Sequence, residues 1–147
     1  MAYTTLVKLI EEFGREILSQ LSDDNETGDI VVAAINKVVK KTESEVDPLL
    51  RGRYPTGIAD MVDLPDTIET YANDIFLYRL YCRKATIKIP DHIKDNYKTA
   101  HKILKEIQTG DVTPFEEEDE PAIFRSNKTS DSKVFNETVK ATYYTGL

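Results

Sequence analysis

Apolar residues between positions 91 and 110 recur at intervals of four, three, four and three, which is the repeat of one helix face. The stripe consists of Ile93, Tyr97, Ala100, Leu104 and Ile107. A helix with one apolar face must bury that face against another element. Gly110 follows the last apolar position and can end the helix. The chain must therefore fold so that at least one amphipathic helix packs on a partner.

The part of the chain before this stripe carries further helical patterns. Thr4 or Thr5 can cap a first helix, and Gly14 can end it in a left-handed conformation without strain. The stretch 66–85 has apolar groups on nearly every side, which is typical of a buried central helix. The other helices are expected at 15–21 and 29–46. We therefore predict a mainly α fold, a small bundle of four to five helices with an extended C-terminal arm.

Both ends of the helix expected at 29–46 depend on single residues. Asp29 can cap its start with a side-chain oxygen. At the other end, Pro48 lacks the N–H that a helix interior needs. Either the helix kinks there, or Asp47 caps a new short helix with Pro48 in its first position.

The charge of the chain is uneven along its length. The net charge is −7, and residues 110–147 carry 8 acidic and 4 basic residues, so −4 of it lies in the last quarter. The block Glu116–Glu120 is entirely acidic and repels itself. We predict a helical domain at 1–112 and an acidic linker with an extended arm at 113–147. The arm carries bulky residues suited to docking on another protein, and these are Phe124, Val134, Phe135, Val139, Tyr143 and Tyr144.

The acidic turn at 23–34 imitates a calcium-binding loop in part. Oxygen-bearing side chains stand at its positions one, three and five, and Gly28 stands at position six. Position twelve is Ala34, where such a loop needs a bidentate glutamate. We therefore expect a polar turn without tight calcium binding.

Residue types that carry catalysis are few and badly spaced. His92 and His101 are nine residues apart, which puts them on opposite faces of one helix, and both are expected to be solvated. Cys82 is the only cysteine; it excludes an intramolecular disulfide, suits a reducing cytoplasm and is expected to fill the core. No signal peptide or membrane span is visible. We expect neither enzymatic activity nor a metal or other cofactor.

The basic residues concentrate at 51–53 and 79–84, where they could contact DNA phosphates or an acidic neighbour. Pairing within the chain, with Asp47, Glu69 and Asp74, is the simpler expectation. Arg79 lies in the most apolar helix and needs a partner, so it is expected to bridge helices or subunits. The tyrosines of that helix have helical spacing and are expected to pack in the core. The candidate residues for binding a partner here are Arg51, Arg53, Tyr54 and Arg79.

Five stretches of the chain together resemble one known family. They are MAYTTLVKLIEEFG, LSDDNETGDI, VDPLLRGRYP, DTIETYANDIFLYRLYCRKA and IKDNYKTAHKILKEIQTGDV, within residues 1–112. Their order and spacing are similar to those of the small neck proteins of Mu-like phages and prophages, which act as head–tail adaptors. Two features depart from the family pattern, namely Pro48 and the long acidic stretch at 115–121.

The resemblance implies a ring-shaped adaptor in the neck of the virion, made in the cytoplasm of the host bacterium. The implied partners are the portal protein, copies of the chain itself in a ring, and a downstream neck or tail-terminator protein. DNA would pass through the ring without specific binding, since net negative charge repels it. No membrane is involved.

Two other classes of function stay open on the sequence. An acidic regulatory protein of a prophage, for example an inhibitor that imitates nucleic acid, would act as a monomer or dimer with a concentrated acidic face. An enzyme would need acid, base or metal ligands that converge, and none have useful spacing. The state of assembly separates the first class from a ring-forming adaptor.

Overall fold

A computed structural model describes residues 3–54 and 64–115 of the chain. These residues form five α-helices and no strand: α1 (Leu6–Phe13), α2 (Arg15–Ser22), α3 (Val32–Arg51), α4 (Asp66–Cys82) and α5 (Asp91–Thr109). The predicted mainly α bundle of four to five helices is confirmed. The chain divides into two compact units, Met1–Pro114 and Phe115–Leu147. The predicted extended arm lies outside the described residues, and the predicted domain boundary stays a prediction.

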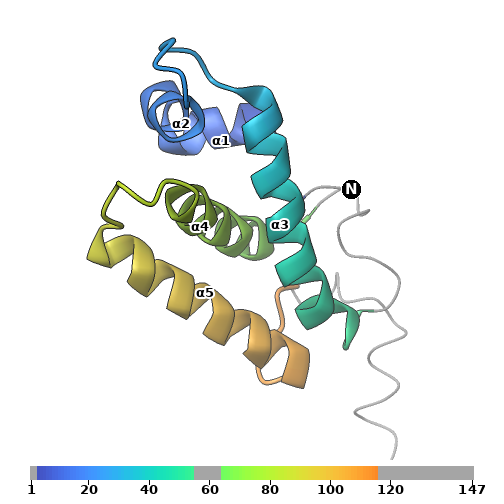
Figure 1. The fold of residues 1–147 in the computed structure, drawn as a ribbon. Helices are drawn as coiled ribbons and strands as arrows, with labels where there is room; N and C mark the ends of the chain where they lie inside the picture. Colours follow the sequence, from blue (N-terminus) through green and yellow to red (C-terminus); the bar gives the residue numbers. More distant parts are fainter. Residues whose placement is uncertain (1–2, 55–63, 116–147) are drawn as a thin grey trace, which may run out of the picture. The chain divides into compact units, whose positions relative to one another are not determined.

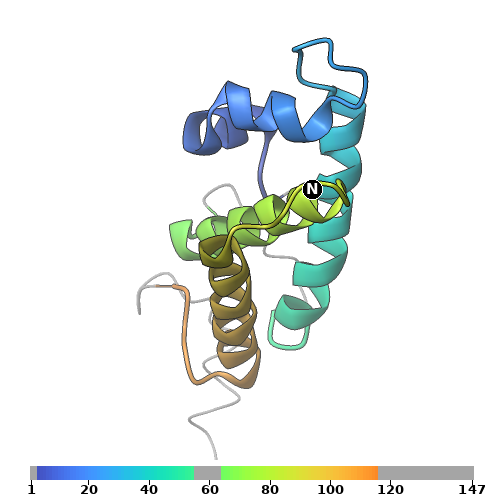
Figure 2. The ribbon, with the colours of Figure 1, turned by 60° about the vertical axis from the view of Figure 1, so that its left-hand side comes forward.

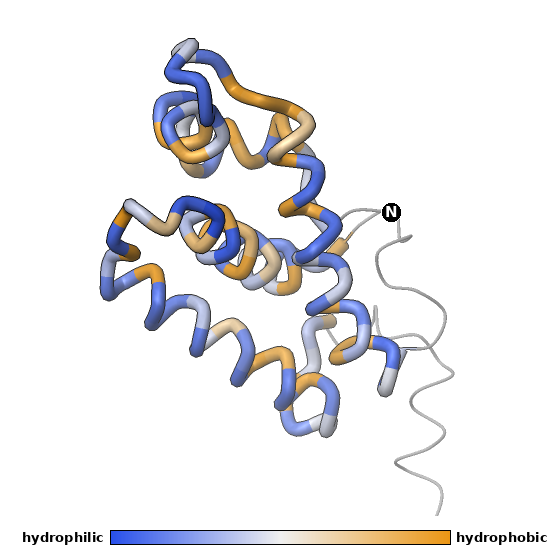
Figure 3. Tube along the Cα trace, viewed as in Figure 1, coloured by the Kyte–Doolittle hydropathy of each residue, from blue (hydrophilic) through white to orange (hydrophobic). Residues whose placement is uncertain are grey.

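Helix α4 is the centre of the first unit. It lies between the α1–α2 pair and α5, while α3 crosses the stack and contacts α2, α4 and α5 (Figures 1 and 2). Hydrophobic and hydrophilic residues alternate along each helix of the unit, α4 included (Figure 3). Ile68, Ile75, Phe76 and Leu80 of α4 have no solvent exposure. Burial of four such side chains makes α4 the element on which the other helices pack.

The first two helices meet at a glycine in an unusual conformation. Thr5 caps α1 by accepting a hydrogen bond from the backbone N–H of Lys8 at 3.4 Å, as predicted. Gly14 ends α1 with φ 84° and ψ 149°. The predicted end at Gly14 is confirmed, but the left-handed helical conformation is wrong because ψ lies in the extended range. Residues with a side chain rarely adopt this combination.

Substituting Gly14 with alanine tests this conformation directly. We expect the free energy of unfolding to fall by about 1–3 kcal/mol, the usual cost of a strained backbone at a residue with a side chain. Steric conflict adds nothing, since no atom lies within 4 Å of the added Cβ. The measurement is urea unfolding followed by circular dichroism. An unchanged midpoint would show that the α1–α2 joint relaxes freely.

The loop between α2 and α3 is a polar turn built on Asp23. Its carboxylate accepts hydrogen bonds from the backbone N–H of Asn25 at 3.0 Å and of Gly28 at 2.7 Å, and from the Thr27 hydroxyl at 3.1 Å. The predicted polar turn is confirmed. The predicted cap is wrong, because α3 begins at Val32 and no side chain caps it.

Pro48 lies inside α3, which continues through it to Arg51 as one helix. The alternative of a new helix capped by Asp47 is therefore wrong. Asp47 instead accepts a hydrogen bond from the hydroxyl of Tyr3, which is buried. Burial and this bond to a carboxylate raise the pKa of Tyr3. The contact fastens the start of the chain to the second half of α3.

Candidate functional site

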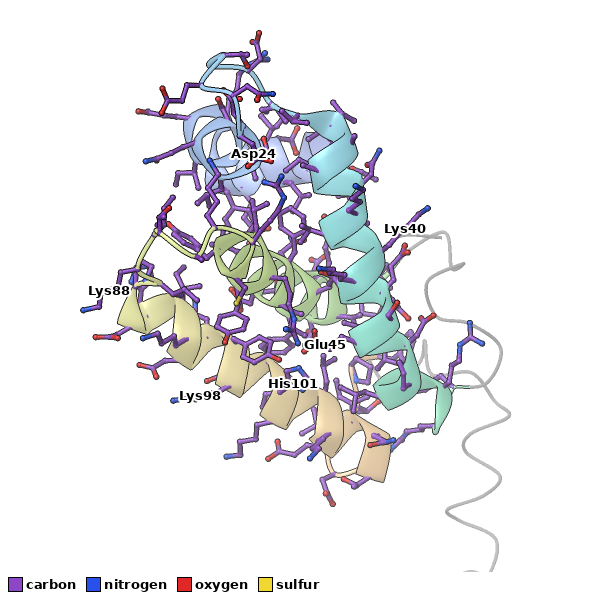
Figure 4. All side chains as sticks on the ribbon, in the orientation of Figure 1. Asp24, Lys40, Glu45, Lys88, Lys98 and His101 are labelled. Carbon is purple, nitrogen blue, oxygen red and sulfur yellow. The ribbon has the colours of Figure 1, made fainter. Side chains whose placement is uncertain are left out.

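One half-buried carboxylate joins three helices of the bundle. Glu45 of α3 accepts hydrogen bonds from the Nε of Arg79 at 2.7 Å and from the hydroxyl of Tyr97 at 2.5 Å. His101 bonds to the same carboxylate through Nε2. Arg79 comes from α4, and the other two donors come from α5. Figure 4 shows Glu45 and His101 pointing toward each other between α3 and α5.

The electrostatics of this cluster favour the charged carboxylate strongly. Burial alone raises the pKa of Glu45, whose side chain is only 15% exposed. The bonds from Arg79, Tyr97 and His101 outweigh burial and lower that pKa to about 2. Burial and the bond to Glu45 raise the pKa of Tyr97 to about 12. Glu45 is therefore charged and Tyr97 neutral around neutral pH.

Aromatic rings close the cluster on one side. The rings of Tyr78 and Tyr97 stack with centroids 4.0 Å apart and planes at 19°. The guanidinium carbon of Arg79 lies 5.5 Å from the centroid of the Tyr97 ring, within the range of a cation–π interaction. His101 meets Tyr97 edge-on at 4.7 Å. Stacking locks the rotamers of the donors, so the bonds to Glu45 lose little side-chain entropy on forming.

A second polar contact joins the end of α4 to the end of α2. The Arg83 guanidinium donates to the carbonyl of Leu21 at 3.1 Å and also contacts Asp24. The Lys84 ammonium donates to the carbonyls of Gln20 at 2.7 Å and Asp23 at 2.6 Å. The last carbonyls of a helix have no partner within it and carry partial negative charge. The two cations therefore act as a cap from another helix.

Arg83→Ala is expected to lower the free energy of unfolding by about 1–2 kcal/mol, since hydrogen bonds to a charged donor are lost from half-buried carbonyls. Lys88→Ala is the matched control, because Lys88 is exposed and forms no ion pair with a described residue. Thermal unfolding of both variants gives the comparison. Equal melting temperatures would contradict the capping role.

An open groove of about 560 Å³ lies between α3 and α4. Three cations line it, Lys41, Arg79 and Arg83, together with the carboxylate of Glu45 and with Val38, Ser44 and Cys82. The prediction that Cys82 fills the core is wrong, because its side chain is exposed at the last turn of α4. The helix pattern placed it among apolar residues, but the groove leaves this part of α4 open to solvent.

The structure separates the four described candidates for partner binding into two places. Arg51, Arg53 and Tyr54 lie at the end of α3, where Arg51 pairs with Asp47 at 3.4 Å and Tyr54 is buried. Arg79 belongs to the Glu45 cluster. The prediction that Arg79 bridges helices is confirmed, and partner binding by these four residues stays a prediction. The arm candidates lie outside the described residues, and these are Phe124, Val134, Phe135, Val139, Tyr143 and Tyr144.

Two of the acidic residues expected to pair with arginines have other partners. Glu69 pairs with Lys8 at 2.5 Å, and Asp74 accepts a hydrogen bond from Asn96 rather than from an arginine. The prediction that His101 is solvated is wrong, because it is half-buried against Glu45. A signal existed for His101, since it follows Tyr97 by one helical turn at the edge of the apolar stripe. Nothing in the sequence around Glu45 marks it as buried.

The side chains of the Glu45 cluster hold the helices of the bundle together. Glu45 accepts bonds from three donors of the same chain, and these bonds hold α3, α4 and α5 together. No group of three His, Cys, Asp or Glu side chains within residues 3–54 and 64–115 could hold a metal ion. Over the same residues, no helix is long and apolar enough to cross a bilayer. The open groove between α3 and α4, which Glu45 and Arg79 of this cluster also line, is the candidate for a binding surface.

Comparison with known proteins gives one family and no curated relative. A family model described as "Bacteriophage Mu, Gp36" matches residues 3–131. No curated protein matches the chain. The matched stretch includes all five helices and most of the chain. The chain thus belongs to the bacteriophage Mu Gp36 family.

Proposed function

We propose that this phage protein is a head–tail connector that docks on the portal and forms part of the neck channel through which DNA passes. The observation that carries the proposal is the family match, which runs through the helical unit and into the C-terminal segment. The resemblance of five stretches to neck adaptors of Mu-like phages supports the same role. The protein acts by binding, without enzymatic activity, in the neck of the virion.

The helical unit has properties that suit such a role. The Glu45 cluster and the cap at the end of α2 hold the helices together by bonds that do not depend on a ligand. A rigid unit can transmit force between portal and tail without deforming. A net charge of −7 opposes adhesion of DNA to the channel wall. Multiple weak contacts, one from each subunit, add up when the ring closes.

The testing experiment images mixtures of this protein with the portal ring of the same phage by electron microscopy. We expect a second ring stacked on the portal with the full-length chain, and a weaker or absent ring with a variant that ends at Val112. A full-length variant with residues 113–147 in scrambled order is the matched control for length and charge. No stacked ring at about 50 μM, where weak contacts become visible, would overturn the connector role.

The alternative is an acidic regulatory or inhibitory binding protein of a prophage. Its support is the acidic block at 116–120 and the overall negative charge. Such a protein binds its target without any portal. Binding to host proteins by the full-length chain, together with no stacked ring, would favour this alternative.

A further inference from the structure

The groove between α3 and α4 has a basic side that the described residues leave unpaired. Lys37, Lys40 and Lys41 are exposed on α3, and none forms an ion pair with a described residue. Lys37 and Lys41 are one turn apart and share a face, and Lys41 lines the groove. Figure 4 shows Lys40 on the outer side of α3. The carboxylate of Glu45 also lines the groove, and it is bonded to Arg79, Tyr97 and His101.

The groove combines this charge with apolar side chains. Val38, which is buried, and Cys82 both line it. Arg83 also lines it, and its bonds to the end of α2 hold it in place. A segment with carboxylates followed by apolar side chains matches both parts of such a surface.

The chain contains one segment of that kind. Residues 116–120 are EEEDE, and Ile123 and Phe124 follow within four positions. We propose that the acidic segment 116–124 of one copy docks in the α3–α4 groove of the next copy, with its carboxylates against Lys37 and Lys41. The inference rests on the proposed ring of subunits, because a head-to-tail contact of this type closes only in a ring.

The geometry of the helical unit is compatible with docking of the acidic segment in the groove of a neighbouring copy. The end of α5 lies beside the end of α3, since a side chain added at Gly52 would meet Gln108 at 3.2 Å. Lys37 lies 15 residues back along α3, which is about 22 Å at the rise of an α-helix. The end of α5 therefore lies near one end of α3, and the acceptor lysines lie toward the other. Two different ends of the unit are the requirement for a head-to-tail chain of contacts.

The native cysteine gives a direct test, because Cys82 lines the groove and the chain has no other. In full-length Glu118→Cys, oxidation by diamide joins the new thiol to Cys82 with loss of two hydrogens to the oxidant. We expect disulfide-linked dimers and higher ladders on a non-reducing gel. Adding Cys82→Ser removes the partner thiol and must abolish the ladder above dimer.

Charge variants decide whether the groove lysines cause the encounter. Lys37→Glu with Lys41→Glu, in the Glu118→Cys background, is expected to lower the yield of linked chains about fivefold, as two exposed ion pairs are lost. Lys98→Glu with Lys102→Glu is the matched control, with the same charge change on the outer side of α5, and must keep the yield. About 0.5 M NaCl is expected to act like the groove variant by screening.

Three results would overturn the inference. If the disulfide forms only within single chains, the segment docks on its own chain. If both charge variants give equal yields of linked chains, the groove lysines do not cause the docking. Binding of a DNA duplex that Lys37→Glu with Lys41→Glu abolishes, without any disulfide, would assign the groove to nucleic acid. The stacked ring on the portal is measured in a separate experiment. If the Lys37→Glu, Lys41→Glu variant still forms that ring, the connector role stands even when the docking inference fails.

Discussion

Replacing Arg79 with methionine is expected to lower the free energy of unfolding by about 2–3 kcal/mol at neutral pH. The reason is the carboxylate left behind. Glu45 is 15% exposed and accepts a hydrogen bond from the guanidinium of Arg79 at 2.7 Å. Removing one partner of such a pair leaves a poorly solvated charge, which is the costly way to disrupt it. Urea unfolding followed by circular dichroism measures the difference.

The double variant Glu45→Met, Arg79→Met measures the interaction free energy between the two side chains, apart from the effect of each substitution alone. Because no unpaired charge remains, we expect it to be at least about 1 kcal/mol more stable than Arg79→Met alone. Lys102→Met serves as the surface control: Lys102 is 75% exposed and lies 3.9 Å from Glu106, so its loss is expected to cost under about 0.5 kcal/mol. Strict additivity of the two single substitutions would contradict the coupling.

Acidification is expected to remove about 2–3 kcal/mol of stability through Glu45 alone. Its pKa is about 2 in the folded chain, against a value of 4.5 for the free side chain. A carboxyl with a depressed folded pKa adds stability that is complete above pH 5. That stability falls as protons bind the unfolded chain first, and it is gone once the pH drops through about 2.

The difference between wild type and Glu45→Gln isolates this contribution. Glu12 and Asp74 have raised pKa values, chiefly from burial, and therefore oppose the trend in both proteins. We expect the stability gap between the two proteins to shrink steadily from pH 5 to pH 2, as followed by urea unfolding. A gap that stays constant over that interval would show that Glu45 titrates normally.

The sequence contained enough information for the helices but not for all their ends. The stripe from Ile93 to Ile107 predicted α5 correctly, because a period of 3.6 residues survives any tertiary arrangement. The start of α3 was placed three residues early at Asp29. A capping residue expresses only a local preference for a helix start. Two other contacts determine the loop instead: the Asp23 carboxylate accepts from the N–H of Gly28, and the Ser22 hydroxyl accepts from the N–H of Val31.

The candidate site could be predicted only in outline. The need of Arg79 for a partner followed from its apolar surroundings, but the partner did not. Glu45 and His101 are 56 residues apart in sequence, and their contact depends on how α3 and α5 cross α4. The burial predicted for Cys82 is wrong because it too depends on how the helices cross. Periodicity shows which face of a helix is apolar, but it does not show whether a neighbouring helix covers the last turn.

The convergence of three donors on one carboxylate constrains how this sequence can change over time. A substitution that removes the acceptor at position 45 leaves the guanidinium, the phenol and the imidazole without their shared partner. A single replacement at any of these four positions is therefore selected against until a second one accompanies it. Among diverged members of the family, positions 45, 79, 97 and 101 should consequently be replaced together, as one correlated set.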